Sequence, residues 1–361
     1  MTSSASTVLI AAGDCVAAPL LAMTGAMHEP PPTEILAALR RMGLLAPGTN
    51  ATGERLTGGV SSDIWRIDLP TGPICVKRAL EKLRVAADWH APVERNRYEA
   101  RWMQRANAAA PGAAPQLLGL DEASGTLAMQ FLSPANHPLW KTQLRDGDAD
   151  PAFAAQVAAS LARIHAATAA DPTTAADFPT DQIFYDIRLE PYLLATARAH
   201  PDLAPQLTNL VATTQANKRA LVHGDVSPKN ILRGPAGPVL LDAECAWWGD
   251  PAFDLAFCLN HLLLKCLWTP SATAGFLACF DALATTYCAL IAWEPAADLE
   301  ARAAHLLPGL FLARVDGKSP VEYITTQADK ARVRRTARAL LAVPVDRLAH
   351  VRQAWTQELA T

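Results

Sequence analysis

Three side chains that could hold a metal ion or accept a proton lie close together within residues 221–255. Asp225 follows a short apolar run, Asn230 comes five residues later, and a second apolar run at residues 239–241 leads directly into Asp242. Carboxylate and carboxamide oxygens are the ligands that Mg²⁺ prefers, and a separate carboxylate can accept a proton from an attacking hydroxyl. Asp and Asn in loops are often simple turn formers, but their order here predicts a phosphoryl-transfer site.

The same order and spacing occur in the protein-kinase catalytic loop, where a metal-binding Asn follows the base Asp by five residues and a later strand supplies a metal-binding Asp. The segments HGDVSPKN (223–230), LLDAE (240–244) and GDPAFDLA (249–256) resemble the signature of the aminoglycoside phosphotransferase and choline kinase-like family of small-molecule kinases. Ser227 stands where protein kinases carry Lys, and Ala-Glu replaces Phe-Gly after Asp242. Both departures favour the small-molecule branch.

The resemblance implies a bilobal protein kinase-like fold of the α+β class, with ATP and Mg²⁺ as cofactors. We expect a disordered leader over residues 1–26, a small antiparallel-sheet N-lobe over residues 27–133, and a large, mostly helical C-lobe over residues 134–361. Translation could start at Met1 or at Met27.

In the C-lobe, the resemblance implies that Asp225 hydrogen-bonds the acceptor hydroxyl and takes its proton, while Asn230 and Asp242 hold Mg²⁺. His223 is expected to brace the catalytic loop by hydrogen bonding and not to act as the base. Glu244, two residues after Asp242, is expected to support the metal shell.

Other polar residues of the C-lobe are expected to be structural. Asp250 reads as a turn and helix-cap acid that ties down the catalytic loop, and Asp254 as a second structural acid. His165, at the end of an apolar helical stripe, reads as a core histidine with satisfied hydrogen bonds. Residues 186–190, which contain Asp186, Arg188 and Glu190, could face the substrate because they precede the catalytic loop.

In the N-lobe, the resemblance implies that Lys77, at the end of an apolar strand, contacts the ATP phosphates and is held by Glu99 from the following helix. The alternatives are an edge-strand charge for Lys77 and a solvated surface pair for Glu99. A small-residue turn is expected to cover the phosphates, and residues 130–132 to contact the adenine. The residues of that turn are Gly58, Gly59, Ser61 and Ser62.

Hydrophobic periodicity gives the elements that must position these residues. A helix capped by Thr33 and stopped by Gly43, and another at residues 93–109, accompany the N-lobe strands. Five strands are expected, at residues 56–62 (with its turn), 64–69, 73–79, 116–120 and 126–132. In the C-lobe we expect a helix from residue 151, a loop over 170–187, two helices split at Pro201, and helices at 252–268, 271–292, 297–313, 319–342 and 345–359.

Amino-acid composition restricts which binding partners and which cellular compartment we expect. Half of the 361 residues are hydrophobic and the net charge is −3, which gives no electrostatic case for nucleic acid or an acidic membrane. No continuous apolar run reaches the roughly 18 residues of a membrane span. An odd number of scattered cysteines without CxxC pairs predicts reduced thiols and a cytoplasmic location. They are Cys15, Cys75, Cys245, Cys258, Cys266, Cys279 and Cys288.

The acceptor is expected to be a small molecule with a hydroxyl group: an aminoglycoside, a choline-like amino alcohol, a sugar, or a methylthioribose-like or homoserine-like compound. Residues 255–361 contain eleven Lys or Arg and nine Asp or Glu, which gives little support to a polycationic acceptor. The polar break at residues 314–323, between two apolar helices, either contacts the acceptor or is an ordinary loop. Two alternatives to a kinase stay open, a catalytically weak nucleotide-binding pseudokinase and a kinase-like AMP transferase.

Overall fold

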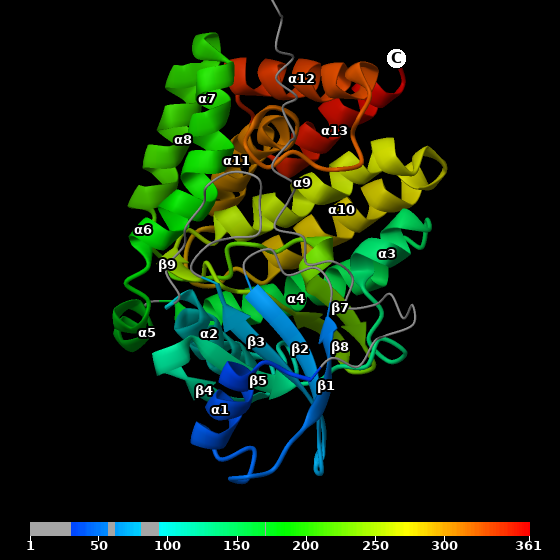
Figure 1. The fold of residues 1–361 in the computed structure, drawn as a ribbon. Coiled ribbons are helices and arrows are strands. Elements are labelled where there is room, and N and C mark those ends of the chain that lie inside the picture. The colour runs from blue at the N-terminus through cyan, green and yellow to red at the C-terminus, as the bar shows by residue number, and fades with distance from the viewer. Residues whose placement is uncertain (1–29, 57–61, 81–93, 170) are drawn as a thin grey trace, which may run out of the picture.

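A five-stranded antiparallel sheet and a large group of helices form two lobes of the chain (Figure 1). The computed structural model describes residues 30–56, 62–80, 94–169 and 171–361. The predicted α+β, bilobal architecture is confirmed. Residues 1–26, expected to be a leader, lie outside the described residues.

The N-lobe sheet has the strand order β1-β2-β3-β5-β4, and each neighbouring pair is antiparallel. The five predicted strands are present, but the first lies earlier than expected and ends at Leu56. Their bounds are Thr52–Leu56 (β1), Ser62–Leu69 (β2), Gly72–Ala79 (β3), Leu117–Asp121 (β4) and Thr126–Gln130 (β5).

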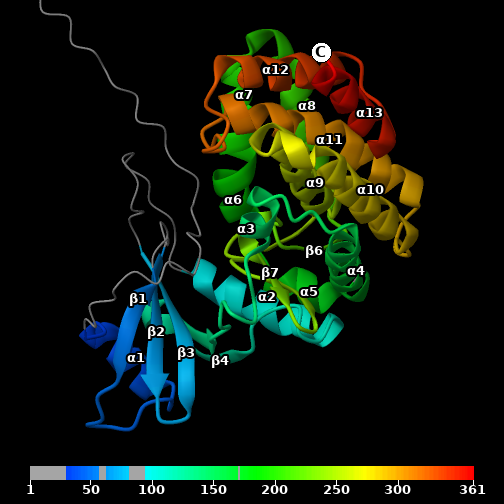
Figure 2. The ribbon, with the colours of Figure 1, turned by 90° about the vertical axis from the view of Figure 1, so that its right-hand side faces the viewer.

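One helix covers each face of this sheet. Side chains alternate along a strand, so Ile74 and Val76 of β3 pack with α1 (Thr33–Arg41) in one hydrophobic cluster. Cys75 belongs to the cluster on the other face, which α2 (Arg95–Ala109) covers. By the same alternation Lys77 faces α2 and the C-lobe, and Figure 2 shows α2 extending from the sheet toward the helices.

The predicted limits of the first helix are only partly right. Thr33 is its first helical residue and does not cap it, because Pro32 occupies the cap position and no side-chain cap bond is made there. Gly43 follows the last turn with φ 73°, a left-handed conformation that glycine adopts at little cost.

The C-lobe is built around four long helices whose apolar residues share one core. These are α4 (Pro151–Thr168), α9 (Ala252–Trp268), α10 (Thr273–Ala289) and α11 (Ala296–Asp316). The shorter α3 (Trp140–Arg145) lies near the N-lobe, and α12 (Gln327–Ala342) and α13 (Leu348–Leu359) close the far end (Figure 1).

Two C-lobe predictions were wrong. Residues 170–187 were expected to be a loop, but they contain α5 (Pro172–Asp177) and α6 (Asp181–Phe184) and enter a π-helical segment, Tyr185–Leu194. Their Asp and Pro residues begin a helix: Asp171 accepts a hydrogen bond from the Thr173 amide, and Pro172 opens α5. α7 (Ala195–Ala199) and α8 (Ala204–Ala216) follow on either side of Pro201.

The helix expected from residue 319 begins only at Gln327, because Thr326 and not Pro320 supplies its N-cap. Residues 317–326 are therefore irregular. The segment Pro270–Ala289, which includes α10, is long and apolar enough to cross a membrane by length and composition. In the structure, Phe276 and Phe280 of this helix are buried in the C-lobe core. The six cysteines within the described residues are all free thiols.

Candidate active site

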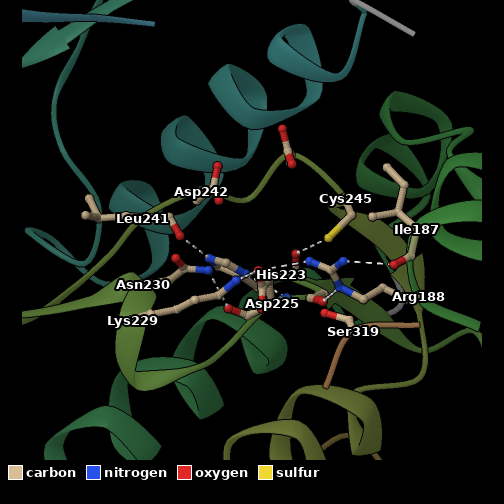
Figure 3. Close-up of polar contacts among 12 residues, drawn as sticks. Ile187, Arg188, His223, Asp225, Lys229, Asn230, Leu241, Asp242, Cys245 and Ser319 are labelled. Carbon is tan, nitrogen blue, oxygen red and sulfur yellow. Dashed lines mark hydrogen bonds and ion pairs between the residues drawn. The ribbon is translucent and has the colours of Figure 1, made fainter. Parts of the chain in front are cut away.

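Two short antiparallel pairs of strands carry the catalytic loop, residues 223–230. β6 (Ala220–Val222) leads into the loop and pairs with β9 (Trp247–Gly249), while β7 (Ile231–Gly234) leaves it and pairs with β8 (Gly237–Leu240). The Leu241 amide donates to the Asn230 carbonyl at 2.8 Å. This register brings the residue after Leu241, which is Asp242, to the catalytic loop, and Figure 3 shows Asp225, Asn230 and Asp242 around one region.

His223 is buried and braces the loop through both ring nitrogens. Its Nδ1 accepts from the Asp225 amide at 3.1 Å, so its Nε2 carries the proton and donates to the Leu241 carbonyl at 3.1 Å. Burial lowers the pKa of His223, which keeps the ring neutral near pH 7. The ring also meets Trp102 of α2 edge-on, with centroids 4.7 Å apart.

Asp225 is 2% exposed and lies between two cations. Its Oδ2 is 3.0 Å from Nη2 of Arg188 and 3.4 Å from Nζ of Lys229. Burial alone raises the pKa of this carboxyl, but attraction to Lys229 and then Arg188 outweighs burial and lowers it. Oδ1 has no hydrogen-bond partner. Asp225 is therefore an anion with one oxygen available for a hydroxyl.

Asn230 and Asp242 are the two residues predicted to hold a metal. The Asn230 Nδ2 group donates to the Asp225 carbonyl at 3.1 Å, while its buried Oδ1 has no partner. Asp242 is the one non-glycine residue with positive φ (66°) within the described parts of the chain, and such strain persists where the surroundings fix an unusual side-chain direction. Repulsion from the Asp242 carboxylate acts to raise the pKa of Asp225, as expected for neighbouring carboxylates.

Lys77 joins the two lobes. Its ammonium lies 2.7 Å from Oε2 of Glu99 and also pairs with Oδ1 of Asp242. Burial tends to raise the pKa of Asp242, but Lys77 more than compensates and lowers it to about 2. For Glu99 burial prevails over Lys77 and raises the pKa to about 7. The predicted Lys77–Glu99 contact is present, and neither residue is at the surface.

Glu244 lies next to this group, with Oε2 at 3.1 Å from Nε of Arg95 and at 4.0 Å from Nζ of Lys77. Arg95 is completely buried and was missed as a site residue. It precedes Glu99 by four residues on α2, so the two side chains share one helix face. That spacing was a usable signal.

The role predicted for Asp250 belongs to Asp254. Asp254 accepts from the amides of His223 and Gly224 at 2.7 and 2.8 Å, and so fixes the start of the catalytic loop. Asp250 does accept from the Ala252 amide at 3.0 Å, as a cap acid would, but its carboxylate faces Arg302 and not the loop. Both acids lie in the segment GDPAFD, and the sequence alone did not show which of the two side chains faces the catalytic loop.

His165 makes a hydrogen bond to the carboxylate of Asp254. It is fully buried, with Nε2 at 3.2 Å from Oδ2 of Asp254 and Nδ1 at 2.6 Å from the Tyr287 hydroxyl. The prediction of a core histidine with satisfied hydrogen bonds is confirmed.

Several other predicted residues lie at the edge of the site or away from it. Ser62 is buried at the start of β2, whereas Gly58, Gly59 and Ser61 lie outside the described residues. Of the three residues expected near the substrate, Arg188 reaches the catalytic loop, donating from Nε to the Gly224 carbonyl. Asp186 instead pairs with Gln182, and Glu190 with Arg198 and Lys318.

The residues present fit a Mg²⁺ ion shared with a nucleotide. Within the described ranges there is no cluster of three or more His, Cys, Asp or Glu side chains able to hold a metal. Mg²⁺ in nucleotide sites is usually bound by only one or two protein groups plus phosphates and water. The partnerless oxygen of Asn230 and the carboxylate of Asp242 are of that kind.

The chain is similar to known small-molecule kinases in sequence and in fold. Methylthioribose kinase 1 of Oryza sativa subsp. japonica is 23% identical over 224 residues, 54% of this chain and 51% of that protein. The chain thus spans about half the length of the first relatives it matches. Among solved structures, an amicoumacin kinase in complex with AMP-PNP, Ca²⁺ and Ami has TM-score 0.52 at 12% identity, covering 86% of this chain and 94% of that one.

A Plasmodium vivax ethanolamine kinase has TM-score 0.51 at 10% identity, covering 89% of this chain and 84% of that one. At such identities these structures show a shared fold. The sequence itself matches the model of the phosphotransferase enzyme family (APH) over residues 52–299, a span that contains both lobes' site residues. The chain therefore belongs to the phosphotransferase enzyme family, as its catalytic-loop motifs predicted.

Proposed function

We propose that this protein transfers the γ-phosphoryl group of ATP to a hydroxyl of a small molecule. One observation carries the proposal: Lys77 of the sheet lobe pairs with Asp242 of the helical lobe, beside Asp225, whose Oδ1 has no hydrogen-bond partner. A phosphate-binding cation, a metal-binding acid and a base are the groups that this reaction needs.

Asp225 accepts a hydrogen bond from the acceptor hydroxyl and aims its oxygen at the γ-phosphorus. As the new O–P bond forms, the bond from the γ-phosphorus to the bridging oxygen of ADP breaks, and the hydroxyl proton passes to Asp225 late in the reaction. The lowered pKa of Asp225 makes it a weak base, which suits a loose transition state with little early proton transfer.

Lys77 orients the nucleotide phosphates, and Glu99 holds it in place at 2.7 Å. Asn230 and Asp242 would hold Mg²⁺, which when bound neutralises charge on the phosphate oxygens. Asp254 keeps the catalytic loop in position through two backbone amides. Residues 130–132, where β5 ends and the chain leaves the sheet, are proposed to contact the adenine.

For the acceptor, similarity to methylthioribose kinases supports a sugar-like compound as the first class to test. The free, mostly buried cysteines support a reducing, cytoplasmic environment.

An acceptor screen tests the function. Purified protein with Mg²⁺ and ATP is incubated with a library of hydroxyl compounds, and ADP release and product mass are measured, with Asp225→Asn as the control. We expect one acceptor class to gain one phosphate, and Asp225→Asn to lose orders of magnitude in turnover while it still binds nucleotide. Nucleotide binding without any transfer would instead identify a pseudokinase, and a protein product heavier by AMP would identify an AMP transferase.

A further inference from the structure

A chain of hydrogen bonds connects the core of the C-lobe to the first residues of the catalytic loop. It begins at the hydroxyl of Tyr287 near the end of α10 and passes through the ring of His165 in the last turn of α4. It ends on the carboxylate of Asp254 in the first turn of α9. All three side chains are fully buried, and α10 packs against both α4 and α9 (Figure 1).

The carboxylate of Asp254 accepts hydrogen bonds from three donors. The Gly224 amide donates to Oδ1 at 2.8 Å, and the His223 amide donates to Oδ2 at 2.7 Å. Nε2 of His165 lies 3.2 Å from the same Oδ2. A buried carboxylate is stable only when such donors satisfy it, so the two loop amides and the histidine ring together set its orientation.

The direction of each bond follows from the chemistry of the groups. An ionised carboxylate can only accept, so Nε2 of His165 carries the proton that Asp254 receives. In the neutral ring Nδ1 is then an acceptor, and the Tyr287 hydroxyl donates to it at 2.6 Å. Burial raises the pKa of Tyr287, which keeps the hydroxyl protonated and able to donate. Tyr287 therefore selects the tautomer of His165 and fixes the plane of its ring.

We propose that Tyr287 is a positioning residue of the catalytic loop, acting through His165 on Asp254. Its consequence for turnover rests on the proposed function. Without the hydroxyl, Nδ1 of His165 loses its donor, and the ring can turn so that Nε2 leaves the carboxylate. Asp254 then holds the Gly224 amide less firmly, and Asp225, the next residue, is aimed less precisely at the acceptor hydroxyl.

Gly224 is the point at which a loosened Asp254 would alter the loop. Its φ of 79° lies in the left-handed region, which glycine enters about as readily as the right-handed one. A Cβ at this position would lie 2.9 Å from both the carbonyl oxygen and Sγ of Cys245, so only glycine fits. Since glycine is conformationally free, the bond to Asp254 must hold it, and this bond sets the direction in which the chain continues to Asp225.

α4 holds the approach to the loop at a second point. Thr168, three residues after His165, accepts through Oγ1 from the Leu221 amide at 3.1 Å and donates to the Ile164 carbonyl at 2.8 Å. Leu221 lies in β6, the strand that leads into the loop. The last turn of α4 thus fixes the strand directly and the loop through His165, and the Tyr287 hydroxyl ties that histidine to α10.

Removing one hydroxyl group tests the proposal. Tyr287→Phe keeps the ring that meets Trp293 edge-on, so packing is preserved. With Mg²⁺-ATP and the acceptor found by the screen, kcat per folded molecule should fall about three- to tenfold. The KM values should stay near those of the wild type, because the hydroxyl acts on the loop and not on a substrate.

The matched control is Tyr98→Phe, which removes a hydroxyl that accepts from Arg97 within α2. It should leave kcat and KM unchanged. A lower melting temperature of Tyr287→Phe with an unchanged kcat would show that Tyr287 is only a core residue, and would overturn the proposal.

His165 must transmit the effect. His165→Gln removes the ring that joins Tyr287 to Asp254. In that background Tyr287→Phe should lower kcat by less than about twofold, so the two substitutions are strongly non-additive. An equal loss from Tyr287→Phe in both backgrounds would mean that the hydroxyl does not act through His165, and would also overturn the proposal.

A measurement without turnover separates this proposal from the kinase function and decides it if His165→Gln does not fold. Nitrogen-15 NMR of the wild type should show His165 protonated on Nε2. Hydrogen exchange of the His223 and Gly224 amides should be at least about fivefold faster in Tyr287→Phe than in Tyr98→Phe. If these results appear but no acceptor is phosphorylated, the kinase function fails and the positioning role stands. A proton on Nδ1 instead, or unchanged exchange in Tyr287→Phe, refutes the positioning role whatever the activity is.

Discussion

The ammonium of Lys229 lies 3.4 Å from the carboxylate of Asp225, four residues before it in the catalytic loop. Lys229 is the largest attractive influence on that carboxyl, ahead of Arg188. The loop thus carries its own cation, in a chain where Ser227 stands at the position of the protein-kinase lysine. Lys229 also lines a pocket that adjoins the catalytic loop.

Replacing Lys229 should change the pH dependence of the reaction. In Lys229→Met the pKa of Asp225 rises, because the main attraction that lowers it is gone. Asp225 must be an anion to accept the proton, so the acidic limb of the kcat/KM profile should move to higher pH. Lys229→Arg keeps the charge and should leave the limb in place. An unchanged limb in Lys229→Met would show that Lys229 does not set the charge state of Asp225.

The contacts that the sequence predicted are those set by regular periodicity. Lys77 and Glu99 are in contact for two reasons. Side chains of β3 alternate between the two faces of the sheet, and every third or fourth residue of α2, Glu99 among them, faces the sheet. Asn230 and Asp242 lie close together because each is within two residues of an apolar strand, and these two strands pair with each other. At these positions the local sequence pattern is enough to predict the tertiary contact.

The contacts that the sequence did not predict depend on the type of helix and on the residue at which a helix begins. Neither can be read from the hydrophobic pattern alone. Arg188 reaches Asp225 from a π-helical segment, whose side-chain directions do not follow a period of 3.6 residues. Asp254, and not Asp250, reaches the loop amides because of where α9 begins, at Ala252. Residues 170–187 were misread because Asp and Pro signal helix starts as well as loops.

Glu99 should make the unfolding free energy depend on pH. Its folded-state pKa is raised to about 7 from 4.5, so the folded state binds the extra proton between these values. Stability from this group is fully present below pH 4.5 and is lost as pH rises through about 7. The difference in unfolding free energy between wild type and Glu99→Gln should fall over this range, by about 1–3 kcal/mol. Denaturant titrations at several pH values measure it, and a difference that stays flat would mean that Glu99 is ionised throughout.

Asp254 and Asp250 should have separable effects. Asp254→Asn weakens two hydrogen bonds from catalytic-loop amides, so kcat per folded molecule should fall at least about tenfold. Asp250→Asn weakens the pair with Arg302, which makes no hydrogen bond or ion pair with the described residues of the loop, and should lower the melting temperature while kcat stays near that of the wild type. Thermal melts and initial rates on both variants distinguish the roles, and equal losses of kcat would return the loop-fixing role to Asp250.

Removing a metal ligand should raise the demand for Mg²⁺. Asn230→Ala takes away one of the two oxygens proposed to hold the ion, and Asp242→Asn takes away the negative charge of the other ligand. In each variant the Mg²⁺ concentration for half-maximal rate should therefore rise by more than about tenfold. Glu244→Gln is the matched control, because Glu244 pairs with Arg95 at 3.1 Å and should shift the Mg²⁺ titration little. The titration is run at saturating ATP, with EDTA abolishing activity in each case. If Glu244→Gln shifts it as far as Asp242→Asn does, Glu244 belongs to the metal shell and its contact with Arg95 must break when nucleotide binds.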